Sequence, residues 1–568
     1  MQVNFLISGS VLTSLIVWRG VFPEFELPKL IILVMCGSVL LFFSIFNYLS
    51  CKQTFRKEIV FFLALYLACL TTIAITTDQN WNVVLIGAGG RYTGFLAQLC
   101  YLFIFYYVIS IRDYFLIKRI FHSFVFTGLL FTIYGLLQAL NLDPIDWNYN
   151  NSILVTLGNT NFSSAFLALN ATATLYILIE NFKNYLKSIL SGILLLAQIY
   201  LIIKINDNQG IILLLSGIFL LLSCLIYSNK KTQKVVKRYW SVQAILIFLG
   251  SVVSYFFQSG PLHYALNISS FVDRTYHWKT GWEIFKDNKL IGVGLDSFGE
   301  YYPLYRTQEI IDFRAIGYEM YSFNPHNSIV QAAVSGGIVL LIGYVSLLGF
   351  IFYRGIRMLQ SSNDPFFVGT IFTVWFLYQL QTLISVDSIG LSIWGWIFSG
   401  ALVALSYSNN NSVENSQNNE IKTYKLESLQ RIILSIFLFL CISTNIYSIN
   451  YLKTNYEYKN LTNHFRDPKS AQVYKSKLDS ELLNLNSKIF QVEIREVTLN
   501  LLVSQKRLDL AVQVAKEMTL DFPRRVNGWD ATAKIYEFNN DFLSAKPYRL
   551  KTIELDPLNK NFQSKLRN

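Results

Sequence analysis

Hydrophobic residues in this chain come in runs of about 20, and short polar segments separate the runs. A helix of that length crosses a hydrocarbon core roughly 30 Å thick, so the pattern predicts an all-α, polytopic membrane protein. We expect thirteen membrane-spanning helices, at residues 3–18, 29–49, 58–77, 95–111, 120–140, 161–180, 187–204, 210–228, 240–258, 327–353, 365–385, 389–407 and 430–450.

Composition and charge agree with a membrane protein and give it an orientation. A hydrophobic content of 53% and a mean hydropathy of +0.37 exclude a soluble multidomain protein. The net charge of +12 does not indicate nucleic acid, because the basic residues cluster in alternate short loops, as the positive-inside rule describes. We therefore expect a cytoplasmic N-terminus, and an extracytoplasmic position for both the 259–326 loop and the tail after the last span.

Composition changes along the chain, from apolar to Asn/Ser-rich, back to apolar and then to polar and helical, and so divides it into four segments. We expect a membrane domain, a cytoplasmic Asn/Ser-rich linker, the last span and an extracytoplasmic helical domain, at residues 1–407, 408–429, 430–450 and 451–568.

The C-terminal segment shows a weak internal repeat. At a 34-residue period Leu508 aligns with Phe542 and Pro523 with Pro557, and Trp529 falls at a tetratricopeptide signature position. Stacked helix pairs offer a groove, so we expect this domain to bind a protein partner or acceptor rather than to perform chemistry.

The longest polar, aromatic-rich interval between spans runs from Arg274 to Gly337. It contains Trp278, the sequence Leu290-Ile-Gly-Val-Gly294, and then Pro325-His326-Asn327-Ser328 with Gln331 at the start of a span. In this order the residues resemble the O-antigen ligase and polymerase superfamily. The resemblance covers about a quarter of the chain.

That resemblance implies a fold, a place and an activity. Members are bacterial membrane glycosyltransferases with a GT-C-like helix bundle, and they transfer glycans from undecaprenyl diphosphate at the outer face of the inner membrane. We therefore expect a lipid-linked glycan and the lipid bilayer as partners, and no nucleic acid. Relatives often have a Glu nine residues after the motif histidine; here Ser335 stands there, so a role for that carboxylate cannot be carried over.

His326 is the predicted catalytic base. It directly precedes a membrane helix, whose N-terminal dipole disfavours an imidazolium, so the ring should be neutral and able to accept a proton. A histidine that only caps the helix is the alternative. Arg274 is the second predicted catalytic residue, because a guanidinium can stabilise a leaving diphosphate. Arg91 and Arg306 are further candidates for binding the diphosphate, although Arg306 fits a solvated surface role equally well.

No Asp-x-Asp pair occurs in the chain, so we expect a metal-independent, inverting transfer without a cofactor. The six cysteines show no CxxC pattern, and none lies in the large loop, which indicates neither a disulfide nor a zinc site.

The remaining predicted substrate contacts each have a structural alternative. Asn159, Asn161 and Asn327 either contact the donor or cap helices. Arg91, in the Gly-rich run 87–94, either binds phosphate or lies at the membrane surface.

Three further side chains complete the predicted site. Trp278 and Tyr302 either stack on sugar rings or anchor the loop at the bilayer interface. Asp387 either positions a site residue or bonds a neighbouring helix.

The sequence does not determine which acceptor receives the glycan. Ligation to a lipopolysaccharide core, chain polymerisation and transfer to protein hydroxyls are all compatible with the superfamily. A solute transporter of the bicarbonate type is the alternative from another class; it would need paired discontinuous spans and charges at the membrane midplane. A membrane scaffold is a third.

Overall fold

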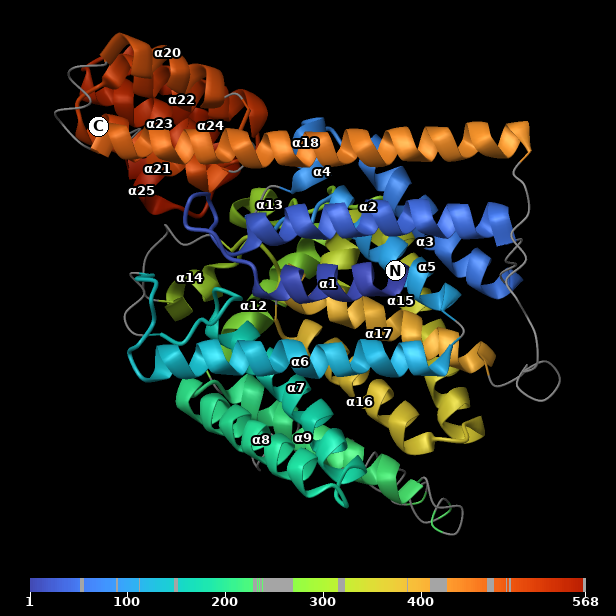
Figure 1. Ribbon diagram of the computed structural model, residues 1–568. Coiled ribbons are helices and arrows are strands. Elements are labelled where there is room, and N and C mark those ends of the chain that lie inside the picture. The colour runs from blue at the N-terminus through green and yellow to red at the C-terminus, as the bar shows by residue number, and fades with distance from the viewer. Residues whose placement is uncertain are drawn as a thin grey trace.

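The computed structural model describes residues 1–51, 56–87, 90–111, 113–147, 152–227, 232, 234, 238, 269–314, 322–385, 387–408, 427–466, 475–486, 488–489 and 492–564. Every regular element in these ranges is a helix, and none of them forms a strand (Figure 1). The predicted all-α membrane fold is therefore confirmed.

The membrane bundle follows the hydrophobic pattern closely. Its helices are α1 (Gln2–Leu15), α2 (Glu26–Cys51), α3 (Lys57–Thr76), α4 (Trp81–Ile86), α5 (Phe95–Ser110), α6 (Tyr114–Ala139), α7 (Thr160–Glu180), α8 (Tyr185–Ile205), α9 (Asn208–Tyr227), α15 (Ser328–Ser361), α16 (Pro365–Thr382), α17 (Ile389–Ser408) and α18 (Ser428–Arg466). Within the described ranges, nine helices are long and apolar enough to cross a membrane. Twelve of the thirteen predicted spans coincide with a helix, and the predicted span 240–258 lies outside the described residues.

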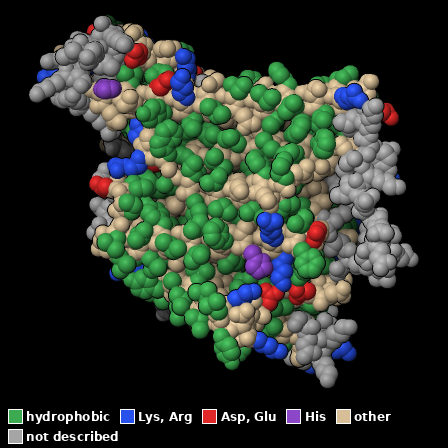
Figure 2. Space-filling model, viewed as in Figure 1, with side chains coloured by type: hydrophobic (Ala, Val, Ile, Leu, Met, Phe, Trp, Pro, Cys, Tyr) green, Lys and Arg blue, Asp and Glu red, His purple; other side chains and the backbone are tan. Residues whose placement is uncertain are grey.

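The centre of the bundle is α17, which is almost wholly buried and packs against α1, α5, α15 and α16. By contrast α18 is largely exposed and packs along α2 at the edge of the bundle (Figure 1). Hydrophobic side chains cover much of the face seen in Figure 2, as expected for helices in contact with lipid.

One membrane helix, α15, is broken. Gly336 (φ −136°, ψ 17°) and Gly337 (φ 58°, ψ −154°) interrupt its helical backbone, and the conformation of Gly337 is essentially restricted to glycine. The segment before α13 fills the gap: Lys289 carbonyl accepts from Ile338 N–H at 2.7 Å, and Val293 N–H donates to Val334 carbonyl at 2.9 Å. The Leu-Ile-Gly-Val-Gly motif thus supplies the hydrogen bonds that the broken helix cannot make for itself.

The large loop contains three helices, α12 (Ser269–Asp287), α13 (Phe298–Tyr305) and α14 (Gln308–Arg314). Of these, α12 and α13 pack against α15. Ile284 of α12, Phe298 and Tyr302 of α13 and Val334 of α15 form a separate small core. This core fixes α12 beside the segment that carries His326.

The helix α18 continues far beyond the predicted span 430–450. Its 39 residues correspond to about 58 Å, nearly twice the thickness of a hydrocarbon core, so the expected domain boundary at residue 451 falls inside a continuous helix. The C-terminal domain follows as α20 (Lys475–Asn486), α21 (Val492–Ser504), α22 (Leu508–Asp521), α23 (Val526–Phe538), α24 (Phe542–Leu555) and α25 (Lys560–Ser564). The starts of α21 and α23, and of α22 and α24, are 34 residues apart.

The C-terminal domain docks on the loop helices, as Figure 1 shows. Arg306 at the end of α13 forms an ion pair with Asp556 after α24, in which its Nη2 donates to both carboxylate oxygens at 2.8 and 2.7 Å. Both side chains are buried. Arg524 and Arg525 of the C-terminal domain stack on Tyr301 and Phe323 of the loop, at 4.7 and 5.1 Å from the ring centroids.

Candidate active site

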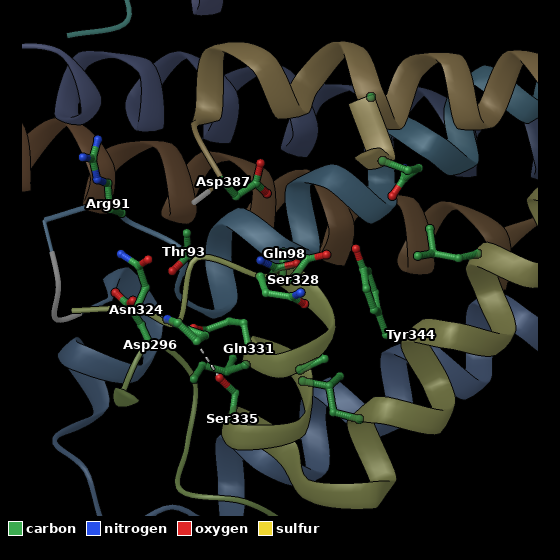
Figure 3. A pocket seen from close by; sticks show the side chains of 18 of the residues that line it. Arg91, Thr93, Gln98, Asp296, Asn324, Ser328, Gln331, Ser335, Tyr344 and Asp387 are labelled. Atoms are coloured by element: carbon green, nitrogen blue, oxygen red, sulfur yellow. Dashed lines mark hydrogen bonds between the residues drawn. The ribbon is translucent and has the colours of Figure 1, made fainter. Parts of the chain in front are cut away.

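A deep pocket opens where the 91–98 segment, the large loop and the start of α15 meet. Its volume is about 1110 Å³ including the open mouth. Arg91, Asp296 and Asn324 line the polar end, and Tyr344 lies farther along it (Figure 3). His326 also lines the pocket. Beyond Tyr344 the lining becomes mostly apolar, with Leu348, Ile351 and Trp396 among its residues.

The Gly-rich run brings Arg91 to this mouth. Gly87 has φ +104°, and a Cβ there would lie 2.6 Å from the Asp296 carboxylate, so glycine lets the run pass against the loop. The Arg91 guanidinium lies over Phe162, 5.1 Å from the ring centroid, and 3.6 Å from the Glu26 carboxylate. One aromatic face and one carboxylate therefore hold the guanidinium at the pocket.

His326 sits at the mouth with a left-handed backbone (φ 53°), and its N–H donates to the Asn324 side chain at 3.1 Å. Its imidazole stacks on that of His277 of α12, with centroids 5.4 Å apart and planes 28° apart. His277 is fully buried, and its Nε2 lies 3.5 Å from the Asp273 carboxylate.

The environment keeps His326 neutral. Its pKa is lowered from 6.5 to about 3. Burial is the largest cause, the neighbouring His277, Arg274 and Arg91 also lower the pKa, and Asp273 opposes them. The prediction of a neutral ring rested on the helix dipole alone; in the structure burial is the main cause. The same interactions place Arg274 and Arg91 within electrostatic reach of the ring.

Arg274 itself does not line the pocket. It is partly buried on α12, and burial lowers its pKa against the carboxylates of Asp207 and Asp273. Asp207 in turn accepts from the Ser164 hydroxyl at 2.5 Å. Arg274 thus interacts electrostatically with the turn between α8 and α9, which contains Asp207.

The first turns of α15 present amides to the pocket. Gln331 Nε2 donates to Ser335 Oγ at 2.9 Å, the bond drawn in Figure 3, and its Oε1 is buried without a partner among the described residues. Asn327 caps the helix, accepting from Ile329 N–H at 2.9 Å, and also donates to Leu383 carbonyl at 2.9 Å. Asn327 therefore both lines the pocket and ties α15 to α16.

Asp387 lines the pocket from the α16–α17 connection. It accepts from Tyr378 Oη at 3.2 Å and from the Ser392 hydroxyl. Burial raises its pKa to about 6.

Other predicted site residues lie away from this pocket. Asn159 caps α7, accepting from Asn161 N–H at 2.8 Å, and neither side chain lines the pocket. Tyr302 is buried against His277, and Trp278 packs on Phe271 at 5.6 Å. Arg306 is held in the buried pair with Asp556 and is neither solvated nor directed to the pocket.

Sequence reasoning missed a buried polar cluster on α2. Glu26 accepts from the Ser388 hydroxyl at 3.2 Å, besides its contact with Arg91. Lys29 Nζ donates to the carbonyls of Ile16, Phe25 and Thr156 at 2.8, 2.8 and 2.6 Å. A carboxylate and an ammonium at the start of an apolar run were the available signal, because such groups are rare inside a membrane.

In the part of the chain that the structure describes, no group of three or more His, Cys, Asp or Glu side chains is arranged to hold a metal ion.

The model of the O-antigen ligase family matches residues 203–345. No curated protein matches the chain. The match spans α9, the loop helices and the first half of α15, and so includes Arg274, His326, Gln331 and Ser335. It supports the resemblance stated from the loop motifs and a glycosyltransferase-like ligase role in a multi-pass membrane protein. Arg91, Asp387 and the C-terminal domain lie outside it.

Proposed function

We propose that the protein is a glycosyltransferase that moves a glycan from undecaprenyl diphosphate to an acceptor hydroxyl at the extracytoplasmic face of the bacterial inner membrane. One observation carries this proposal: a single pocket joins a polar, arginine-bearing mouth to an apolar depth inside the bundle. Leu340 and Ile351 of α15, both after the break, line it, and the eleven residue steps from one to the other correspond to about 16 Å of helix. A lipid diphosphate has the same two parts, a dianionic head and a long hydrocarbon tail.

In the proposed reaction His326 removes the proton of the acceptor hydroxyl. The acceptor oxygen then forms a bond to the anomeric carbon while the bond from that carbon to the diphosphate oxygen breaks. The electron pair leaves with undecaprenyl diphosphate, whose charge Arg91 stabilises from the pocket lining and Arg274 through its electrostatic field from α12. Attack opposite to the leaving group inverts the anomeric centre.

The low pKa of His326 suits this order of events. A base whose conjugate acid has a pKa near 3 accepts a proton poorly at neutral pH, but the guanidinium charges contribute to that value. A bound diphosphate would neutralise their field and raise the pKa of the ring. Burial, the largest cause of the low pKa, would remain, so donor binding would restore part of the strength of the base.

The proposed orientation is supported by charge at the far end of the bundle. There the guanidinium groups of Arg56 and Arg354 lie over the ring of Tyr407, at 4.5 and 3.9 Å from its centroid. Basic residues favour the cytoplasmic side, which leaves the pocket mouth at the outer face.

Purified protein in lipid nanodiscs, supplied with undecaprenyl-diphosphate-linked glycan and an acceptor, tests the activity. His326→Ala should lower the rate about 10²- to 10⁴-fold, the usual contribution of a general base. Exposed His464 supplies the matched control, and His464→Ala should be as active as the unmodified protein. Equal activity of the His326 and His464 variants would disprove the mechanism.

The position of the lipid tail has its own test. Leu348→Trp narrows the apolar part of the pocket, so it should raise the KM for a long-chain donor more than for a short-chain one. Ile342→Trp on the exposed side of the same helix is the control. An identical response to both donors would place the tail elsewhere.

A further inference from the structure

A second large cavity, the C-terminal groove, lies in the helical domain. Its volume is about 2080 Å³ including the open solvent at its mouth. Residues of α21, α23 and α25 line it, together with Phe323 of the large loop. Phe323 stands three residues before His326 and also lines the pocket described above. One aromatic ring therefore forms part of the wall of both cavities.

This shared wall is fixed in place. The guanidinium of Arg525, at the start of α23, lies 5.1 Å from the centroid of Phe323. Its Nη1 is also against Gly299 of α13, where an added Cβ would approach it to 3.1 Å. The end of the groove is thus held at the mouth of the pocket.

The lining of the groove repeats with the helix pairs. Asn527 and Asn561 are 34 residues apart and occupy the second position of α23 and α25. Glu496, Asp530 and Ser564 recur at the same interval on α21, α23 and α25. The Asn527 amide donates to the Glu496 carboxylate, so a hydrogen bond links the first of these sets of equivalent residues to the second. Equivalent polar side chains thus recur on the first helix of each successive pair, α21, α23 and α25.

We propose that this groove binds the acceptor, and that the acceptor is an extended polypeptide whose Ser or Thr hydroxyl enters the pocket past Phe323; this rests on the transferase function proposed above. An amide side chain both donates and accepts, as a peptide group does. Asn527 and Asn561 present such groups on two successive helix pairs, where they can bond the repeating amides of an extended backbone. They bind it without demanding a particular sequence.

Apolar side chains complete the groove. Phe538 and Val503 line it with 68% and 42% of their surface exposed, although both are hydrophobic. Exposed apolar side chains among polar ones suit a chain that presents apolar side chains of its own. A glycan acceptor could stack on Phe538 but would leave the aliphatic side chain of Val503 largely unmatched.

The charges of the groove disfavour a phosphorylated acceptor. Among its described lining residues Lys534 is the one cation, and its Nζ lies 2.6 Å from Asp530. Asp530 is also paired with Arg549 at 2.6 Å. No lining cation is left over for a phosphate group, which a phosphorylated lipid-linked core would require.

Two measurements on the full-length protein in nanodiscs test the proposal. The first is binding of a fluorescein-labelled library of short, unstructured peptides with a central Ser or Thr, followed by anisotropy. The second is transfer of glycan to the same peptides. Asn527→Ala/Asn561→Ala should weaken peptide binding about tenfold or more and lower kcat/KM for the peptide equally. Asn463→Ala/Asn539→Ala, at exposed positions outside the groove, should change neither.

A second variant covers the case in which the asparagine changes disturb folding. Phe538→Ser alters a largely exposed side chain and should weaken peptide binding without lowering the melting temperature. His326→Ala should bind peptides normally and fail to transfer.

The possible failures can be told apart. If the unmodified protein glycosylates a saccharide or lipid core acceptor but neither binds nor modifies peptides, the polypeptide acceptor is wrong and the transferase function stands. If the library binds in the groove but no acceptor of any class is glycosylated, the transferase function is wrong. Groove variants that match the unmodified protein in both measurements would overturn the proposal.

Discussion

The imidazole rings of His326 and His277 are stacked, 5.4 Å apart and 28° from parallel. His326 comes from the turn that opens α15, and His277 from α12 of the large loop. The contact therefore joins the proposed base to a buried histidine whose far side faces the Asp273 carboxylate at 3.5 Å. Any charge on one ring acts directly on the other.

The acid limb of the pH–rate profile should lie at a different pH in kcat/KM, which reports the free enzyme, than in kcat, which reports the donor complex. His326 must be neutral to act as a base, so activity falls as the pH drops through its pKa. That pKa is about 3 in the free protein, so kcat/KM should stay flat well below the ordinary histidine value of 6.5. The bound diphosphate raises the pKa, so the limb in kcat should lie at higher pH. A kcat/KM limb near 6.5 would contradict the environment described for His326.

Replacing the stacked partner should move that limb in a known direction. His277→Phe keeps a ring against His326 and removes a group that lowers its pKa, so the limb in kcat should shift to higher pH. Asp273→Asn removes the carboxylate that raises the pKa, and its limb should shift to lower pH. The pH dependence of kcat measures both. Shifts in the same direction would show that the two substitutions act only by disturbing the fold.

The break in α15 should be sensitive to a single methyl group. Gly337→Ala forces a side chain onto a backbone restricted to glycine and brings a Cβ to 2.4 Å from Leu290 carbonyl. We expect a loss of about 1–3 kcal/mol from the conformation alone. Gly349→Ala is the control on the same helix, because a Cβ there meets nothing within 4 Å and alanine favours a helix. Melting temperatures in detergent should fall for the first variant and not for the second.

The ion pair between Arg306 and Asp556 should stabilise docking of the C-terminal domain only while both partners are present. Arg306→Met or Asp556→Leu removes the oppositely charged partner of a buried group and should cost about 3–5 kcal/mol. The double variant should recover much of that loss, since no charge stays buried at the interface. Limited proteolysis of the C-terminal domain measures docking. Additive effects would mean that the two residues do not depend on each other.

The hydrophobic pattern predicted the membrane bundle because lipid accepts few structures other than long apolar helices. The spacing of 34 residues between equivalent C-terminal helices was also readable, since each helix pair repeats the same local packing. The path of the chain around Gly336 and Gly337 was not: two glycines signal an interruption, but only the fold shows that residues 289–294 fill it.

The site was predicted in part for the same reason. His326 and Arg91 stand in short sequence motifs that can be recognised locally, and both line the pocket. The contact with His277 depends on how α12 packs against α15, and no periodicity encodes that. For Arg306 the local sequence left a surface role and a substrate role equally open; its partner Asp556 stands 250 residues away, beyond the reach of local patterns.

The continuous helix α18 determines how far the C-terminal domain stands from the lipid surface. A flexible tether would let that domain capture acceptors over a wide radius. Because α18 packs along α2 and is continuous up to Arg466, it instead fixes the distance and the orientation of the C-terminal domain. Insertion of four residues midway along its exposed part would raise the domain by about 6 Å and rotate it by roughly 40° beyond a full turn. With the natural length of α18, glycan addition would be confined to hydroxyls at one distance above the bilayer.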